Sequence, residues 1–217
     1  TETAAIGVSP INGLVYWVER TVATPRFGTW NPATGATSII GNAATPAGIA
    51  SFIRATFCPD GRFYIAGNGS AGGAGAEIYQ INPANGALIR TLVITNIPTS
   101  GSGDIVCMSN GDMYVMAQSV GAGTPYQLYR ITAAQVNTGG TFAANLQGNL
   151  NTPNTQAFNG LSERADGRIL ASVAFNTTAN YVINTTTAVA TTLTTVASAA
   201  LVDLSREFPR DVSVTKT

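Results

Sequence analysis

The chain has 217 residues, enough for one domain with a substantial core, and 45% of them are hydrophobic at a mean hydropathy of +0.17. Only 10% are charged, and eleven basic residues balance eleven acidic ones, so no long-range field attracts nucleic acid or an anionic membrane surface. This composition excludes a disordered chain and a basic nucleic-acid-binding domain. No stretch approaches the roughly 20 continuous apolar residues of a membrane helix, so membrane insertion is not expected.

A short glycine turn recurs four times along the chain, and an apolar, aromatic-rich run follows each copy within a few residues. Asn-Gly and Asp-Gly pairs favour tight hairpins, and a repeat of this length is typical of stacked-sheet arrays. The glycines are spaced 48, 50 and 56 residues apart. The four copies are Ile11-Asn12-Gly13, Pro59-Asp60-Gly61, Ser109-Asn110-Gly111 and Ala165-Asp166-Gly167.

Two predicted hairpins, or four antiparallel strands, make up each unit. The first unit is expected to have strands at 4–10, 14–18, 27–30 and 36–40. The second unit is expected to have them at 54–60, 62–67, 77–81 and 87–94. In the third, strands at 104–110, 112–117 and 126–131 precede a longer loop through Gly139 and Gly140 and a last strand at 141–146. Predicted strands of the fourth include 168–173, 180–183 and 188–196.

Four-stranded units of about 40 to 50 residues in tandem are the blades of a β-propeller. The sequence therefore predicts an all-β fold, a β-propeller of four-stranded antiparallel blades at about 4–42, 49–96, 102–149 and 156–196. A further first strand follows at 199–209 without the rest of its blade, so we expect five blades, the fifth incomplete in this chain. Four blades plus a C-terminal extension is the alternative. The propeller domain would span 1–209, and 210–217 would begin a following module or a tail.

The run AIGVSPINGLVYWV at 5–18, with the hairpin WNPATGATSIIG at 30–41, resembles the repeat β-propeller domains of large, adhesin-like bacterial cell-surface proteins. LVDLSREFP at 201–209 is similar to the segment on which those propellers end. The last residues, 211–217, resemble the first strand of the immunoglobulin-like repeat module that often follows. The resemblance implies export, an extracellular location at the cell surface and a structural or adhesive role, and it implies no catalytic residues. The start at Thr1 favours a processed or trimmed piece of a longer protein.

Nucleophilic catalysis has few candidate residues in this chain. Histidine is absent, which excludes Ser-His-Asp and Cys-His arrangements, and the one lysine is the penultimate residue, Lys216. Glu163 with Asp104 remains formally available as a carboxylate pair for glycoside hydrolysis, although eleven scattered acids bring some pair together by chance. We therefore expect no enzyme activity, no catalytic residues and no cofactor.

Metal ligands are also scarce. Without histidine, and with its two cysteines in different units, the chain has too few soft ligands for zinc. Asp60, Asp112 and Asp166 each lie at or beside a glycine turn, where a carboxylate typically caps its own backbone. Asp104 and Asp203, near first strands, are expected to face the ring axis or one mouth. The sequence therefore predicts no metal site.

The two cysteines lie at related places in neighbouring units. Cys58 precedes its turn glycine by three residues and Cys107 by four, an offset that points the two side chains to opposite faces of their sheets. Because neighbouring blades pack front to back, the two side chains can meet between the second and third blades. A disulfide and two small buried thiols are both compatible with this placement.

Two tryptophans and two arginines gather in the first unit, namely Trp17, Arg20, Arg26 and Trp30. An exposed tryptophan beside arginine suits sugar stacking or a protein contact, and core packing is the plainer interpretation. These four residues are the candidate ligand or partner contact.

The sequence as a whole favours a non-enzymatic structural or adhesive module of an exported bacterial surface protein. It is expected to act through protein–protein assembly, with a protein partner or with further copies of the same protein. A glycan-binding propeller is the alternative, and a secreted hydrolase or lyase is the least favoured function.

Overall fold

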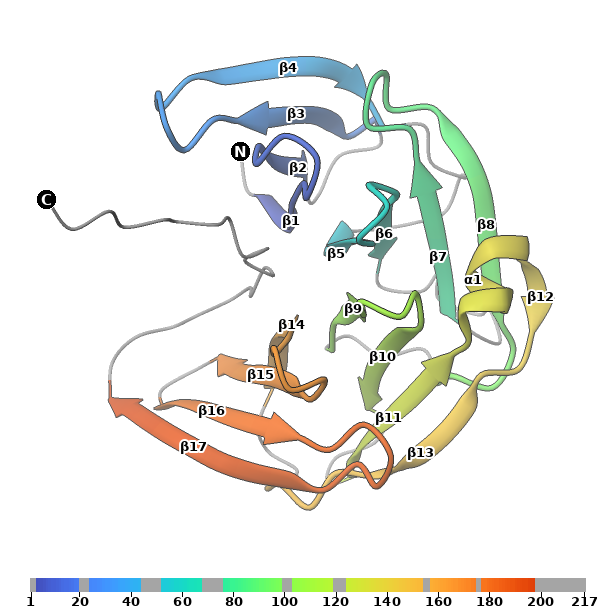
Figure 1. The fold of residues 1–217 in the computed structure, drawn as a ribbon, viewed down its shortest axis with the longest axis vertical. Helices are drawn as coiled ribbons and strands as arrows, with labels where there is room; N and C mark the ends of the chain where they lie inside the picture. The colour runs from blue at the N-terminus through green and yellow to red at the C-terminus, as the bar shows by residue number, and fades with distance from the viewer. Residues whose placement is uncertain are drawn as a thin grey trace, which may run out of the picture.

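The structure is a computed structural model that describes residues 3–19, 24–43, 52–67, 76–98, 103–118, 124–153, 157–174 and 177–197. These residues form four antiparallel sheets that follow one another along the chain (Figure 1). The fold is an all-β propeller, and each sheet is one blade. The predicted first strand of a fifth blade at 199–209 and the predicted module at 210–217 lie outside the described residues, and the four-blade alternative is consistent with the structure.

Each blade runs in order from an inner to an outer strand. Blade one comprises β1 (Thr3–Val8), β2 (Val15–Glu19), β3 (Arg26–Trp30) and β4 (Thr37–Asn42). Blade two comprises β5 (Phe52–Phe57), β6 (Phe63–Gly67), β7 (Ala76–Ile81) and β8 (Leu88–Ile94). Blade three comprises β9 (Ile105–Cys107), β10 (Met113–Gln118), β11 (Tyr126–Ile131) and β13 (Asn145–Asn149). Blade four comprises β14 (Ala157–Glu163), β15 (Ile169–Ala174), β16 (Thr177–Ile183) and β17 (Ala190–Ala197).

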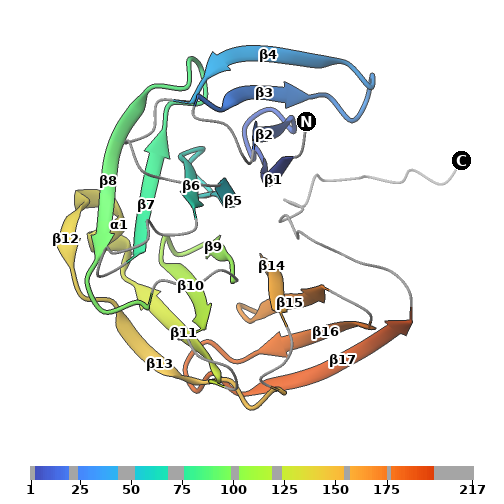
Figure 2. The same ribbon diagram turned by 180° about the vertical axis from the view of Figure 1, so that it is seen from behind.

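The blades are arranged around a common centre. Inner strands contact one another in the order β1, β5, β9 and β14, and the outer strands lie at the rim. The view from behind shows the same order, with blades one and four at the two ends of the arc of described sheets (Figure 2).

The recurring turn joins the two inner strands of every blade. Its Asn or Asp side chain accepts a hydrogen bond from the backbone N–H two residues later, for example Leu14 N to Asn12 Oδ1 at 3.0 Å. The following glycine has a positive φ, 69° at Gly13 and 85° at Gly111, which side-chain-bearing residues rarely adopt. The same side-chain bond recurs at Asp60, Asn110 and Asp166.

Packing of each blade against the next forms the core. The tyrosine three residues after the turn glycine is buried in each of the first three blades, and each copy belongs to a different inter-blade cluster. Tyr16 lies between blades one and two with Phe63, Tyr64 between blades two and three, and Tyr114 between blades three and four. These aromatic residues therefore make up the inter-blade core.

The third blade differs from the prediction at its last hairpin. Residues 141–146 were expected to form its outer strand, but the outer strand is β13. A short helix, α1 (Ala133–Thr138), and a strand, β12 (Gly140–Phe142), precede it, and β12 pairs in parallel with β8 of blade two. Thr132 is the N-cap of the helix, and its side chain forms a capping box with Gln135.

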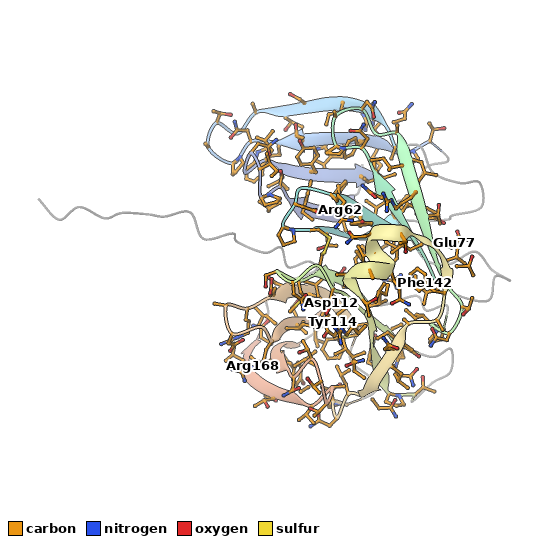
Figure 3. All side chains as sticks on the ribbon, turned by 45° about the vertical axis from the view of Figure 1, so that its right-hand side comes forward. Arg62, Glu77, Asp112, Tyr114, Phe142 and Arg168 are labelled. Atoms are coloured by element: carbon orange, nitrogen blue, oxygen red, sulfur yellow. A yellow bond between two sulfur atoms is a disulfide. The ribbon has the colours of Figure 1, made fainter. Side chains whose placement is uncertain are left out.

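The segment formed by α1 and β12 connects blade three to the outer edge of blade two. Phe142 on β12 is labelled beside the helix in Figure 3. Beyond the strand pairing, the Asn96 side chain binds both backbone groups of Ala144, with its Nδ2 2.8 Å from the carbonyl and its Oδ1 2.8 Å from the amide. Thr95 N donates to Phe142 O at 3.0 Å. The outer edge of β8 is thus covered by a segment of the neighbouring blade.

Replacing Asn96 by Ala removes both side-chain bonds to Ala144. We expect this to lower the free energy of unfolding by about 1–3 kcal/mol and to speed amide exchange in β12 before the inner strands respond. Hydrogen exchange and denaturant unfolding measure the two effects. Gln147→Ala is the matched control, because that half-buried side chain bonds within its own strand, to Asn145 O. Equal exchange rates in β12 for both variants would contradict the prediction.

Candidate functional site

Three of the four residues predicted as a partner contact lie on one face of blade one. Trp17 pairs with Gly28, and Val15 pairs with Trp30, so alternation along the strands sends Trp17, Trp30 and Arg26 to the same side of the sheet. Ile6 and Ile39 continue the row of Trp17 and Gly28 onto β1 and β4. We call this side the Trp17 face. Arg20, the fourth predicted residue, lies outside the described residues.

Trp17 rests directly on the backbone of Gly28. A Cβ atom at Gly28 would lie 2.4 Å from Trp17 Cζ2 and 2.5 Å from the backbone oxygen of Ser38. No side chain fits at this position, so the glycine leaves the room that the indole ring occupies. Trp17 is consequently held half-buried with its ring over the sheet.

An ion pair lies beside the two tryptophans on the Trp17 face. Arg26 Nε donates to Glu19 Oε1 at 2.7 Å, and Arg26 N donates to Glu19 Oε2 at 2.8 Å. The Arg26 Nη2 group also contacts Oε1. These hydrogen bonds to Arg26 hold the pKa of the buried Glu19 carboxyl below its usual value. The face therefore combines an aromatic centre with one paired charge at its end.

Apolar side chains on the Trp17 face remain exposed. Trp30 is 42% exposed and Ile39 is 58% exposed, whereas the opposite face of the same sheet, with Tyr16 and Phe27, is buried against blade two. Neither Trp17 nor Trp30 belongs to the hydrophobic clusters of the described residues. An aromatic surface next to a paired charge is suited to protein or sugar contact.

The structure also brings the two cysteines together. Cys58 and Cys107 form a disulfide between blades two and three, with their Cα atoms 4.9 Å apart. Both side chains are buried in the cluster that joins these blades. The bond crosses the junction near the inner strands β5 and β9.

A second group of polar residues lies on the inner strands. Buried Arg54 donates from Nε to Gly103 O at 2.9 Å and from Nη1 to Gly67 O at 2.9 Å. Asp104 accepts from Leu161 N at 2.7 Å, which links blades three and four. Burial raises the pKa of Asp104 to about 8, although Arg54 acts in the opposite direction. Burial also lowers the pKa of Arg54.

Asp104 and Glu163, the formal carboxylate pair, each have partners on the neighbouring blade. Glu163 accepts bonds from Ser109 N at 2.9 Å and Ser109 Oγ at 2.6 Å. Asp104 accepts from the backbone of Leu161, two residues before Glu163 on β14. Each carboxylate therefore binds backbone of the neighbouring blade.

The three aspartates beside the turns have structural partners. Asp60 and Asp166 bind the backbone and guanidinium of the arginine two residues later, Arg62 and Arg168. Asp112 accepts bonds from Arg130 and from the backbone N–H of Ala133 at the start of α1. Among the residues that the structure describes, no cluster of three ligand-type side chains could hold a metal ion. Asp203, expected at the axis or one mouth, lies outside the described ranges.

Arg54 and Gly28 were missed by the sequence reasoning. A lone arginine in an inner strand is ordinarily read as exposed, and its burial depends on the carbonyls of Gly103 and Gly67, which the chain brings near only when folded. Gly28 could have been recognised from the sequence, because a glycine within a strand often marks a close approach of another group.

The fold is similar to several solved structures, although no protein-family model and no curated protein matches the chain. The PQQ-bound form of aldose sugar dehydrogenase from Streptomyces coelicolor has a TM-score of 0.58 at 13% identity, covering 94% of this chain and 71% of that one. A nidogen/laminin complex has a TM-score of 0.54 at 12% identity, covering 84% and 60%. The Dos1 propeller has a TM-score of 0.50 at 11% identity, covering 95% and 49%.

These similarities establish the class of the fold, a β-propeller, and nothing more specific at such identities. The chain spans less than two thirds of the length of the nidogen/laminin and Dos1 chains. No helix in the described ranges is long and apolar enough to cross a bilayer.

Reducing the Cys58–Cys107 bond should destabilise the fold. The bond closes a loop with a sequence separation of 49 residues, and we expect its loss to lower the free energy of unfolding by about 2–4 kcal/mol. Intact mass before and after alkylation reports the bond, and thermal unfolding with and without reductant reports its effect. A paired Cys58→Ala and Cys107→Ala variant should unfold like the reduced protein and should not respond to reductant. Alkylation of both cysteines without prior reduction would contradict the disulfide.

Asp104 should make stability depend on pH. The pKa of its carboxyl is raised in the fold, so its stabilising contribution is complete below about pH 4, the ordinary value for aspartate, and is lost as pH rises through about 8. Asp104→Asn should therefore flatten the fall in stability between these limits. Denaturant unfolding from pH 4 to 9 measures this slope.

Asp166→Asn is the control for this titration, because the fold lowers the pKa of Asp166 and raises that of Asp104. Arg168 lowers the pKa of Asp166 to about 2, so its contribution is present above about pH 4 and is lost as pH falls through about 2. The Asp166 variant should therefore alter the pH dependence only below about pH 4 and should leave the slope from pH 4 to 9 unchanged. Identical slopes for the wild type and Asp104→Asn would overturn the role of Asp104.

Proposed function

We propose that the chain is a non-enzymatic structural or adhesive module of an exported bacterial surface protein, and that it acts by protein–protein assembly. The Trp17 face is the observation that carries this proposal. It exposes Trp30 and Ile39 beside a rigidly seated Trp17, and tryptophan is enriched among the residues that dominate binding energy at protein interfaces.

Export to the cell surface is supported by the chemistry of the chain. A disulfide such as Cys58–Cys107 persists in oxidising compartments and is rare in the cytosol. The resemblance of residues 5–18 and 30–41 to bacterial surface propellers agrees with this location. Only 10% of the chain is charged, so its surface carries few charged groups.

Glycan binding is the second candidate, and one observation favours it. The Trp17 ring lies against Gly28, and the Glu19–Arg26 pair lies on the same face. An aromatic surface with hydrogen-bonding groups beside it is the combination that a sugar ring uses. A glycan array separates the two candidates: binding of a defined sugar that is lost in Trp30→Ala would favour the lectin function over assembly.

A secreted hydrolase or lyase has the least support. The one carboxylate pair that the sequence offered, Asp104 and Glu163, binds backbone groups at separate places on the inner strands.

The assembly proposal is tested by placing a charge on the Trp17 face. Ile39→Asp should leave the fold intact, since Ile39 is 58% exposed. We expect it to reduce by tenfold or more the amount of protein cross-linked to partners in the extracellular or envelope fraction of its source. A binding penalty of about 1.4 kcal/mol is enough for a tenfold reduction. Leu146→Asp is the matched control, because Leu146 is 51% exposed on an outer strand of blade three. Equal cross-linking of wild type, Ile39→Asp and Leu146→Asp would overturn the proposal.

A further inference from the structure

The three described junctions between blades follow one pairing rule. On the side of each blade that faces the preceding blade, a small or aliphatic residue of the second strand pairs directly with a tyrosine of the third. All three tyrosines lie in inter-blade clusters and are at most 6% exposed. The pairs are Ile65 with Tyr79, Val115 with Tyr129, and Ala171 with Tyr181.

Blade one keeps the aromatic residue but moves it to the other strand. The equivalent pair is Trp17 with Gly28, so the ring comes from the second strand and the small residue from the third. Trp30 likewise takes the place of Ile81, Ile131 and Ile183, each fully buried in its junction. The Trp17 face therefore has the chemistry of an inter-blade face, but it lies at the end of the arc of described blades.

The opposite side of each junction shows what such a face packs against. The preceding blade contributes a tyrosine three residues after its turn glycine and an apolar residue two positions later. These pairs are Tyr16 with Val18, Tyr64 with Ala66, and Tyr114 with Met116.

Blade four does not carry this pair. Leu170 and Ser172 occupy the two positions, and a polar Asn180 takes the place of Phe27, Ile78 and Leu128 on the third strand. Blade four of a second copy is thus a poor match for the Trp17 face. Two Trp17 faces set against each other would make a front-to-front pairing that none of the described junctions uses. Neither blade four nor a second Trp17 face therefore supplies the complementary surface among the described residues.

We infer that the Trp17 face binds a four-stranded β-blade of a partner protein, packed front to back as in the junctions of this chain. The partner blade presents a tyrosine and, two residues later, an aliphatic side chain to Trp17, Trp30 and Ile39. This inference rests on the proposed function and specifies the kind of partner.

Trp17 and Trp30 are the only tryptophans in the chain, so tryptophan fluorescence reports on this face alone. In the purified full chain we expect a red-shifted emission that acrylamide quenches readily and equally at all protein concentrations. Shielding at every concentration would mean that the chain covers its own face, and shielding that grows with concentration would mean a second copy. Either result would overturn the inference.

A tethered donor blade supplies the positive test. A second copy of residues 3–51 is fused before the full chain, with the copied Trp17 and Trp30 changed to Phe, so that the copied Tyr16 and Val18 meet the original Trp17 face. We expect a blue shift and a severalfold smaller quenching constant, because the residues equivalent to Trp30 in blades two to four are fully buried. The control fusion carries Tyr16→Asp and Val18→Asp in the copy and should leave the emission unchanged.

A second fusion guards against a donor that does not fold. It uses residues 52–98, whose Tyr64 and Ala66 form the same pair, and circular dichroism verifies added β-structure in both fusions. Unshielded tryptophans in both fusions would overturn the inference, as would shielding by oligosaccharides alone. Neither fusion involves the native partner, so their failure is separate from the cross-linking result that tests assembly itself.

Discussion

Burial of each sheet against the next is the interaction on which the rest of the structure depends. A four-stranded sheet has two faces, and a chain with 10% charged residues cannot cover both with ion pairs and solvated side chains. Each junction instead buries a tyrosine from both sides, such as Tyr16 and Tyr79 between blades one and two. Aromatic side chains bury about 150–250 Å² each, so one pair contributes much of the apolar contact at a junction.

Polar and covalent links reinforce the junctions both near the centre of the arrangement of blades and at its rim. Near the centre, the Cys58–Cys107 bond and the Arg54–Gly103 hydrogen bond join blades two and three, and Asp104 joins blade three to blade four. At the rim, β12 leaves blade three and extends the sheet of blade two. The middle junction is therefore fastened at both its inner and its outer end, whereas the packing at the other two rests more heavily on apolar side chains.

Much of this architecture was predictable because its signals are local. An Asn or Asp before a glycine specifies a turn through its own backbone bonds, so the position of every inner hairpin followed from the sequence. The outer strand of blade three was placed wrongly, because the pairing of β12 with β8 depends on an edge supplied by another blade. The sharing of one face by Trp17, Arg26 and Trp30 also needs the register of two strands, which a single sequence leaves open.

Gly28 gives the clearest argument that the Trp17 face is a built surface. A glycine inside a strand costs stability through its backbone freedom and packs no side chain of its own. Here it leaves room for the Trp17 ring, which then holds a half-buried aromatic surface in one orientation. A terminal face with no ligand or partner would be more stable and more soluble with polar side chains at Trp30 and Ile39. The cost of Gly28 and the exposure of these residues are both accounted for when a complementary surface covers them.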